Sequence, residues 1–193
     1  MKTKELLPLW KEVESIIRHS SVSEDPLHAK NTLQWLLRLN PHANETMKLA
    51  AFAHDIERAL PERKVKREDF PDYNAFKLAH ARNSAKIIAE LMGKYGVCIK
   101  DIEEVRYLVA HHETGGCERS DLIRDADSLS FFDVNLAFYA KRNRFQEVVD
   151  RCLWGYKRIS AKRRKYLYEL IENRKEVATF VKNILYKGSA QTV

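Results

Sequence analysis

The near absence of helix-interrupting residues constrains this chain more than any other feature. Its 193 residues include only six glycines and five prolines, and clusters of turn-forming residues are sparse. Apolar residues instead recur at intervals of three and four over long stretches, which places them on one face of an α-helix. The sequence therefore predicts a nearly all-helical protein. Because no internal repeat, low-complexity segment or flexible linker is visible, we expect one domain over residues 1–193.

Residues that favour helix ends mark several of the expected helices. Asp25-Pro26 predicts the start of a helix that runs to about Leu39, because aspartate caps helix N-termini and proline suits the first turn. Asn44, Asp101 and Ser120 are the expected caps of three later helices. Other helices are expected over about 3–18, over 73–92 and, as two to four segments, over 133–187. The clearest apolar stripe of that last region consists of Val177, Phe180, Val181, Ile184 and Leu185.

Composition argues against a membrane-spanning or disulfide-bonded protein. No apolar run approaches the roughly 20 residues of a membrane span, and the N-terminus lacks the apolar core of a signal peptide. The three cysteines are widely spaced and form no CxxC pair, so we expect isolated reduced thiols. These observations predict a cytoplasmic protein.

Positive charge is concentrated in the C-terminal region. From Lys141 to the end there are 14 basic and 5 acidic residues, a local charge of +9, whereas the whole chain carries +7. We expect basic helices over about 141–187, densest at residues 162–165. Such a run could attract nucleic acid, but the helical spacing of Tyr166 and Tyr168 favours a solvated helix face.

Metal-ligating residue types form an ordered series along the predicted helices. The series is His28, His54, Asp55, His80, His111, His112 and Asp127. His54 and Asp55 follow the apolar segment 49–53, and buried polar groups must be paired or bound. Imidazoles and carboxylates together suit iron, manganese, zinc, nickel or cobalt. Although each histidine alone is weak evidence, the whole series predicts a site for one or two divalent transition metal ions inside a helical bundle.

The order of these residues resembles the HD-domain superfamily, which is named for its histidine-aspartate doublet. Ala53-His54-Asp55-Ile56 is similar to the doublet segment of that family. Asp125-Ala126-Asp127-Ser128-Leu129 is similar to its distal aspartate segment, in which the second aspartate is the ligand. The resemblance covers roughly residues 20–140 and implies an HD-domain-like helical bundle, with the C-terminal helices added to it.

The resemblance also implies a set of metal ligands. His28, His54, Asp55 and Asp127 match the residues that hold one ion in the family. His80 and His111, with His112 as the alternate to His111, match in order the histidines that bind a second ion in some subfamilies. His111-His112-Glu113 is also similar to a segment of the HD-GYP subfamily. The Gly-Tyr-Pro of that subfamily is missing here, which argues against cyclic-dinucleotide hydrolysis.

Many members of the superfamily hydrolyse phosphoesters, and we expect this activity on a nucleotide or another small phosphorylated substrate. Metal-bound water would be the nucleophile, with Asp55 as the catalytic residue that bridges the ions and orients it. Arg58 and Arg82 are candidates for contacts with substrate phosphate. Glu113 is a candidate general acid or base. Glu57, Glu113 and Asp125 are candidates for orienting the imidazoles.

Two other functions fit the same residues. Some HD-domain proteins are di-iron oxygenases with this ligand order, and an HD-like domain can also bind a nucleotide or a partner without catalysis. For any of these, we expect the substrate pocket to be built from residues 61–73, the Gly115-Gly116 turn and the C-terminal helices. The sequence assigns no oligomeric state.

Overall fold

The computed structural model describes residues 6–173 and residue 181. Every regular element within this part of the chain is helical, which confirms the predicted all-α class. The elements are α1 (Leu7–Arg18), α2 (Asp25–Leu39), α3 (Glu45–Ala53), η1 (Ile56–Ala59), η2 (Arg67–Asp69), α4 (Tyr73–Lys94), α5 (Ile99–Ala110), α6 (Glu118–Ser130), η3 (Phe131–Asn135), α7 (Leu136–Arg142), α8 (Phe145–Arg158), η4 (Ala161–Arg163) and α9 (Arg164–Asn173). No helix among the described residues has the length and apolar character needed to cross a membrane.

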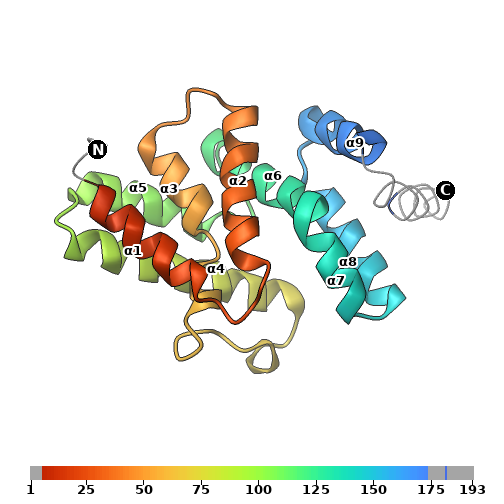
Figure 1. The fold of residues 1–193 in the computed structure, drawn as a ribbon, viewed down its shortest axis with the longest axis horizontal. Helices are drawn as coiled ribbons and strands as arrows, with labels where there is room; N and C mark the ends of the chain where they lie inside the picture. Colours follow the sequence, from red (N-terminus) through yellow and green to blue (C-terminus); the bar gives the residue numbers. More distant parts are fainter. Residues whose placement is uncertain (1–5, 174–180, 182–193) are drawn as a thin grey trace.

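Helix α2 runs through the middle of the molecule, with α1, α3 and α5 on one side and α7–α9 on the other (Figure 1). It packs against α3 and α6, while α5 packs against α3 and α4. The short helix α3 is buried from Leu49 to Ala53. Three alanines in this segment allow neighbouring helices to approach closely, so the polar residues that follow it are carried into the interior.

Helix starts agree with the sequence at two positions and differ at two. Helix α2 begins at Asp25 itself, so that Glu24 and not Asp25 is the N-cap, and the Asn44 side chain accepts a hydrogen bond from the first turn of α3. The expectation for Asp101 was wrong, because Cys98 precedes α5 and Asp101 lies within its first turn. The expectation for Ser120 was also wrong. Cys117 precedes α6, and the Ser120 hydroxyl accepts a hydrogen bond from the Cys117 amide at 3.0 Å.

The C-terminal region supplies three described α-helices, the short helix η4 and a π-helical segment. This segment, η3, joins α6 to α7, and such local irregularities are frequent at functional sites. Of the apolar stripe expected near the C-terminus, Val181 is buried. The other members, Val177, Phe180, Ile184 and Leu185, lie outside the described residues.

Candidate metal centre

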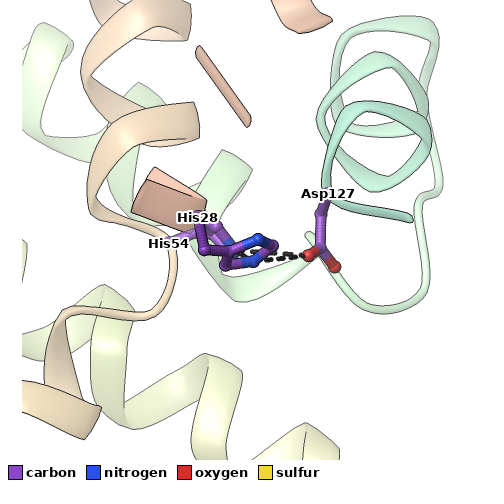
Figure 2. A group of neighbouring side chains, drawn as sticks. All are labelled: His28, His54 and Asp127. Carbon is purple, nitrogen blue, oxygen red and sulfur yellow. Dashed lines mark hydrogen bonds and ion pairs between the residues drawn. The ribbon is translucent and has the colours of Figure 1, made fainter. Parts of the chain in front are cut away.

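Three side chains from three helices converge on one point. The carboxylate oxygen Oδ1 of Asp127 on α6 lies 3.1 Å from Nε2 of His28 on α2. The same oxygen lies 3.4 Å from Nε2 of His54 at the end of α3. The two Nε2 atoms are 3.3 Å apart. Figure 2 shows both imidazole rings directed at the Asp127 carboxylate.

Asp55 extends this group toward a fourth element. Its Oδ1 atom lies 3.7 Å from His54 Nε2 and 3.6 Å from Nε2 of His112, which follows α5. Its other oxygen, Oδ2, lies 3.9 Å from His28 Nε2. His80 on α4 is closer still, with its Nε2 atom 2.7 Å from Asp55 Oδ1. Asp55 therefore lies between the His28 side and the His80 side of the cluster.

A third group of potential ligands completes the cluster. His80, His112 and Glu113 each offer an atom within 4.8 Å of the others. Glu113 Oε1 lies 3.2 Å from His112 Nε2. Three such groups are present within the described chain, and they share His54 and His112 between them. Together the three groups contain seven different residues that could hold metal.

The ring orientation of the histidines suits metal binding. In each, Nδ1 donates a hydrogen bond: His28 to Ser130 Oγ at 2.9 Å, His54 to the Ala51 carbonyl at 2.9 Å, His112 to the Val109 carbonyl at 2.7 Å, and His80 to Glu57 Oε1 at 2.7 Å. A proton fixed on Nδ1 leaves Nε2 as the lone-pair donor, which is the usual arrangement around bound metals. All four Nε2 atoms face the shared centre.

The separations within the first group fit a transition metal ion. Bonds of about 2.1 Å from a tetrahedral ion to its ligands place those ligands roughly 3.4 Å apart, and the three separations among His28, His54 and Asp127 are 3.1–3.4 Å. His112 Nε2 is buried without a hydrogen-bond partner among the described residues, and the Glu113 oxygen that faces it at 3.2 Å is itself an acceptor. Buried polar atoms in this state call for a ligand. The residues present therefore fit a bound metal.

Basic side chains neutralise the carboxylates of the cluster. Arg158 Nη2 on α8 lies 2.8 Å from Asp127 Oδ2 and 3.0 Å from Glu113 Oε2, and Lys77 on α4 pairs with Glu113. Against the opposing effect of burial, Arg158 holds the pKa values of Asp127 and Glu113 well below their usual range. The neighbouring imidazoles do the same for the pKa of Asp55. All three carboxylates are therefore ionised, as metal ligands must be.

The pKa values of three imidazoles in the cluster shift in different directions. Burial opposes protonation of His54, but Asp55 and Asp127 raise its pKa to about 9. Asp55 also raises the pKa of His80, against burial and the charge of a nearby lysine. Burial lowers the pKa of His112. An incoming cation would therefore displace protons from His54 and His80, so metal binding is coupled to proton release.

The adjacent histidines His111 and His112 have different places in the structure. The structure brings His112 into the cluster, where it is fully buried, and does not bring His111 there. The His111 ring stacks on Tyr107 with 4.1 Å between centroids, and its Nδ1 donates to the Tyr107 carbonyl. Successive residues at a helix end differ in direction by about 100°, so only one of the two can face the centre. Of the two histidines considered for a second ion, the structure therefore brings His112 to the cluster in place of His111.

Arg58 and Arg82, the two arginines that the sequence suggested as contacts for substrate phosphate, also differ in their distance from the cluster. Arg58 lies beside the cluster, 3.1 Å from Asp55 Oδ2 and 2.7 Å from Asp25 Oδ1. Arg82 is exposed on α4, and the structure places it in neither the cluster nor the adjoining cavity. Arg58 can therefore contact a ligand at the cluster, whereas Arg82 has no such position.

The carboxylates proposed to orient the imidazoles have three different roles. Glu57 accepts the hydrogen bond from His80. Glu113 lies next to His112 as a further potential ligand. Asp125 is directed away from the histidines and accepts hydrogen bonds from Arg163 Nη1 and the Ser160 amide. It therefore holds the segment before α9 to the core.

A cavity of about 300 Å³ adjoins the cluster, at the small end of the range for ligand pockets. His80, Glu57 and Arg58 line it on the cluster side. Its other lining residues include the aromatic side chains Tyr73, Phe76, Phe131 and Tyr139, and the basic side chains Lys64, Lys77, Arg142 and Arg151. The expected contributions from residues 61–73 and the C-terminal helices are therefore present. The Gly115-Gly116 turn is not among the lining residues.

Several residues of the site carried no signal in the sequence. Arg158 and Lys77 belong to helices that sequence patterns describe only as basic or amphipathic, and Ser130 follows the distal aspartate segment without any distinctive spacing. Their roles depend on partners up to 102 positions away along the chain. For Lys77 alone, the spacing of three residues from His80 indicated that the two side chains share one face of a helix.

Comparison with known proteins adds a family assignment. No curated protein and no solved structure matches the chain. A family model described as a domain of unknown function (DUF4202) matches residues 11–181. That range spans most of the chain and includes every residue of the cluster and of its adjoining cavity. The chain therefore belongs to the DUF4202 family.

Proposed function

We propose that this protein is a metal-dependent phosphohydrolase of the HD-domain type that acts on a small phosphoester. The observation that carries the proposal is the convergence of four Nε2 atoms with Asp55, Asp127 and Glu113 beside a cavity with basic walls. The resemblance of the His54-Asp55 doublet and the Asp127 segment to the HD-domain superfamily supports it.

One ion would be held by His28, His54, Asp55 and Asp127, and a second by Asp55, His80, His112 and Glu113. A bound divalent ion lowers the pKa of its water toward neutrality and so supplies hydroxide at pH 7. Manganese, iron, zinc, nickel and cobalt all suit such ligands. Asp55, between the two groups, is the residue that would orient this water.

The remaining residues bind and position the substrate. Arg58 lies on the cavity wall and is fixed by Asp25 and Asp55, so its guanidinium can meet a phosphoryl oxygen without first being ordered. Lys77 lines the same cavity and adds a second positive charge. Together they stabilise charge on the phosphoryl oxygens as the ester bond breaks.

Metal analysis followed by a phosphoester panel tests this function. We expect a metal-to-protein ratio near two, and phosphate release from at least one small phosphoester at the same rate with and without oxygen. The Asp55→Ala variant should bind less metal, and its kcat/KM should fall at least about 100-fold, because both groups of ligands lose a shared oxygen. Asp150→Ala removes an exposed carboxylate on α8 and should behave as the wild type.

Other outcomes would favour a different function. Oxygen consumption by an iron-loaded protein that releases no phosphate would replace the proposal with a di-iron oxygenase. Full activity and metal content in Asp55→Ala would contradict a metal-dependent hydrolase. Binding of a phosphorylated ligand without turnover under any metal would indicate a non-catalytic domain.

A further inference from the structure

The basic residues of the cavity differ in how their charge is neutralised. Arg58 pairs with Asp25 and Asp55. Lys77 pairs with Glu113, and Arg142 pairs with Glu24. Two basic lining residues have no carboxylate within ion-pair distance among the described residues: Lys64, which is exposed, and Arg151, which lines the cavity from α8.

Arg151 is nevertheless held in place and partly buried. Its guanidinium lies 4.7 Å from the ring centroid of Phe131 and 4.3 Å from that of Trp154. These aromatic faces stabilise the cation and fix the plane of the guanidinium. Its Nη1 atom is buried without a hydrogen-bond partner. A guanidinium ordered in this way, with a buried donor left over, is a preformed receptor for an anion.

A second polar atom in the same cavity is also without a partner. The side-chain oxygen Oδ1 of Asn135, in the π-helical segment η3, is buried and accepts no hydrogen bond within the described part of the chain. Asn135 lines the cavity together with Arg151. Buried polar atoms are ordinarily satisfied by protein, water or ligand. Two such atoms among the lining residues indicate that the cavity contacts a polar ligand.

We propose that Arg151 binds a second anionic group of the substrate, so that the substrate class is a small phosphoester with an additional phosphate or carboxylate. This inference rests on the proposed function, which places the reacting phosphoryl group beside His80, Arg58 and Asp55. Arg151 pairs with neither Asp55 nor Asp127 in the described structure, so a substrate with one phosphate at the cluster would leave its charge without a counter-ion.

Binding of matched phosphonates tests the proposal without turnover. Phenylphosphonate and 4-carboxyphenylphosphonate differ by one anionic group, and titration calorimetry on the purified protein measures their affinities. We expect 4-carboxyphenylphosphonate to bind about 10- to 100-fold more tightly than phenylphosphonate, because one charge-assisted hydrogen bond changes affinity by about this factor. A third probe, 1,4-phenylenediphosphonate, shows which anion is recognised. Tighter binding of this probe would indicate a second phosphate, and weaker binding a carboxylate. Equal affinities for all three probes would overturn the proposal.

Variants of α8 assign the preference to Arg151. Arg151→Gln should reduce the preference to near unity, while Lys157→Gln, which removes an exposed charge from the same helix, should retain it. If circular dichroism shows that Arg151→Gln does not fold, Arg151→Lys replaces it. This variant keeps the charge but loses the forked geometry, so the preference should fall several-fold. A preference unchanged in the folded variant would overturn the role of Arg151.

Hydrolysis assays keep this inference separate from the proposed function. Phenyl phosphate and 4-carboxyphenyl phosphate are the matched esters, and phosphate release is the measurement. A preference among the phosphonates without hydrolysis of either ester would support the anion site and count against the hydrolase. Hydrolysis of both esters at equal kcat/KM, with equal phosphonate affinities, would support the hydrolase and overturn the anion site.

Discussion

The distinction between His111 and His112 is decided by a single residue step at the end of α5. His112 is fully buried with Nε2 directed at Asp55, whereas His111 stacks on Tyr107. We expect His112→Gln to lower the metal-to-protein ratio from about two toward one, because it removes a ligand from the second group. His111→Gln is the matched control and should leave the ratio unchanged. Elemental analysis measures both, and equal ratios in the two variants would contradict the assignment.

Ser130 is expected to act on the metal through His28. Its hydroxyl accepts the Nδ1 proton of His28 at 2.9 Å and donates to the backbone carbonyl of the same residue. Ser130→Ala should weaken metal binding by about 10- to 100-fold, because the ring loses the partner that fixes its proton and orientation. Competition with a chromogenic chelator measures the affinity.

Ser128 offers a control two residues away on the same helix. It is buried like Ser130, but its hydroxyl donates to the Arg124 carbonyl. Ser128→Ala should therefore retain wild-type affinity. A loss of affinity of the same size in both variants would point to general destabilisation of α6 rather than to His28.

The sequence predicted the candidate ligands unevenly for a physical reason. Segments similar to a known family selected His54, Asp55 and Asp127, and the order of the ligands in that family selected His28. The structure brings these four residues together. His111 was selected over His112 because helix ends cannot be located to within one residue from sequence. Arg158 was missed because an ion pair between distant segments leaves no mark on local spacing.

At the scale of elements, helix existence was predicted better than helix ends. Long amphipathic repeats indicated α2 and α4 to within two residues of their observed bounds. The caps of α5 and α6 were placed three residues too late, because Asp101 and Ser120 lie in the first turn rather than before it. Acidic and hydroxyl residues are favoured at both positions, so composition alone does not separate them.

The turn between α5 and α6 depends on Gly115. This residue has φ +73°, and a Cβ there would lie 2.0 Å from Asp121 Oδ1 and 2.4 Å from Arg124 Nη1. We expect Gly115→Ala to lower the free energy of unfolding by about 1–3 kcal/mol, because strained backbone and displaced side chains add. Denaturant unfolding followed by circular dichroism measures the change.

Gly93 provides the opposite case within a helix. It lies near the end of α4, and a Cβ there would meet nothing within 4 Å. Gly93→Ala should leave stability unchanged or raise it by up to about 1 kcal/mol, because alanine favours helix more than glycine does. A larger loss at Gly93 than at Gly115 would contradict the observed turn geometry.

At the scale of the whole molecule, the C-terminal helices belong to the site. The resemblance covered residues 20–140 and treated the basic helices that follow as an addition. In the structure, α8 supplies Arg158 to the cluster and Arg151 to the cavity. Farther along, Arg163 pairs with the buried Asp125 at 2.8 Å. Part of the C-terminal positive charge therefore neutralises acidic groups of the core, which a count of charge along the chain does not reveal.

Arg158 joins the C-terminal region to the cluster and provides the test of this arrangement. Besides Asp127 and Glu113, its Nη2 atom reaches the His112 carbonyl at 2.9 Å. Removing one partner of a buried ion pair ordinarily costs about 3–5 kcal/mol, because the other charge is left uncompensated. A bound cation would supply much of the missing charge. We therefore expect Arg158→Gln to lower the melting temperature strongly in chelator and much less with Mn²⁺, as measured by thermal unfolding. Equal losses in the two conditions would show that Arg158 acts only on the packing of α8 and not on the charge of the metal centre.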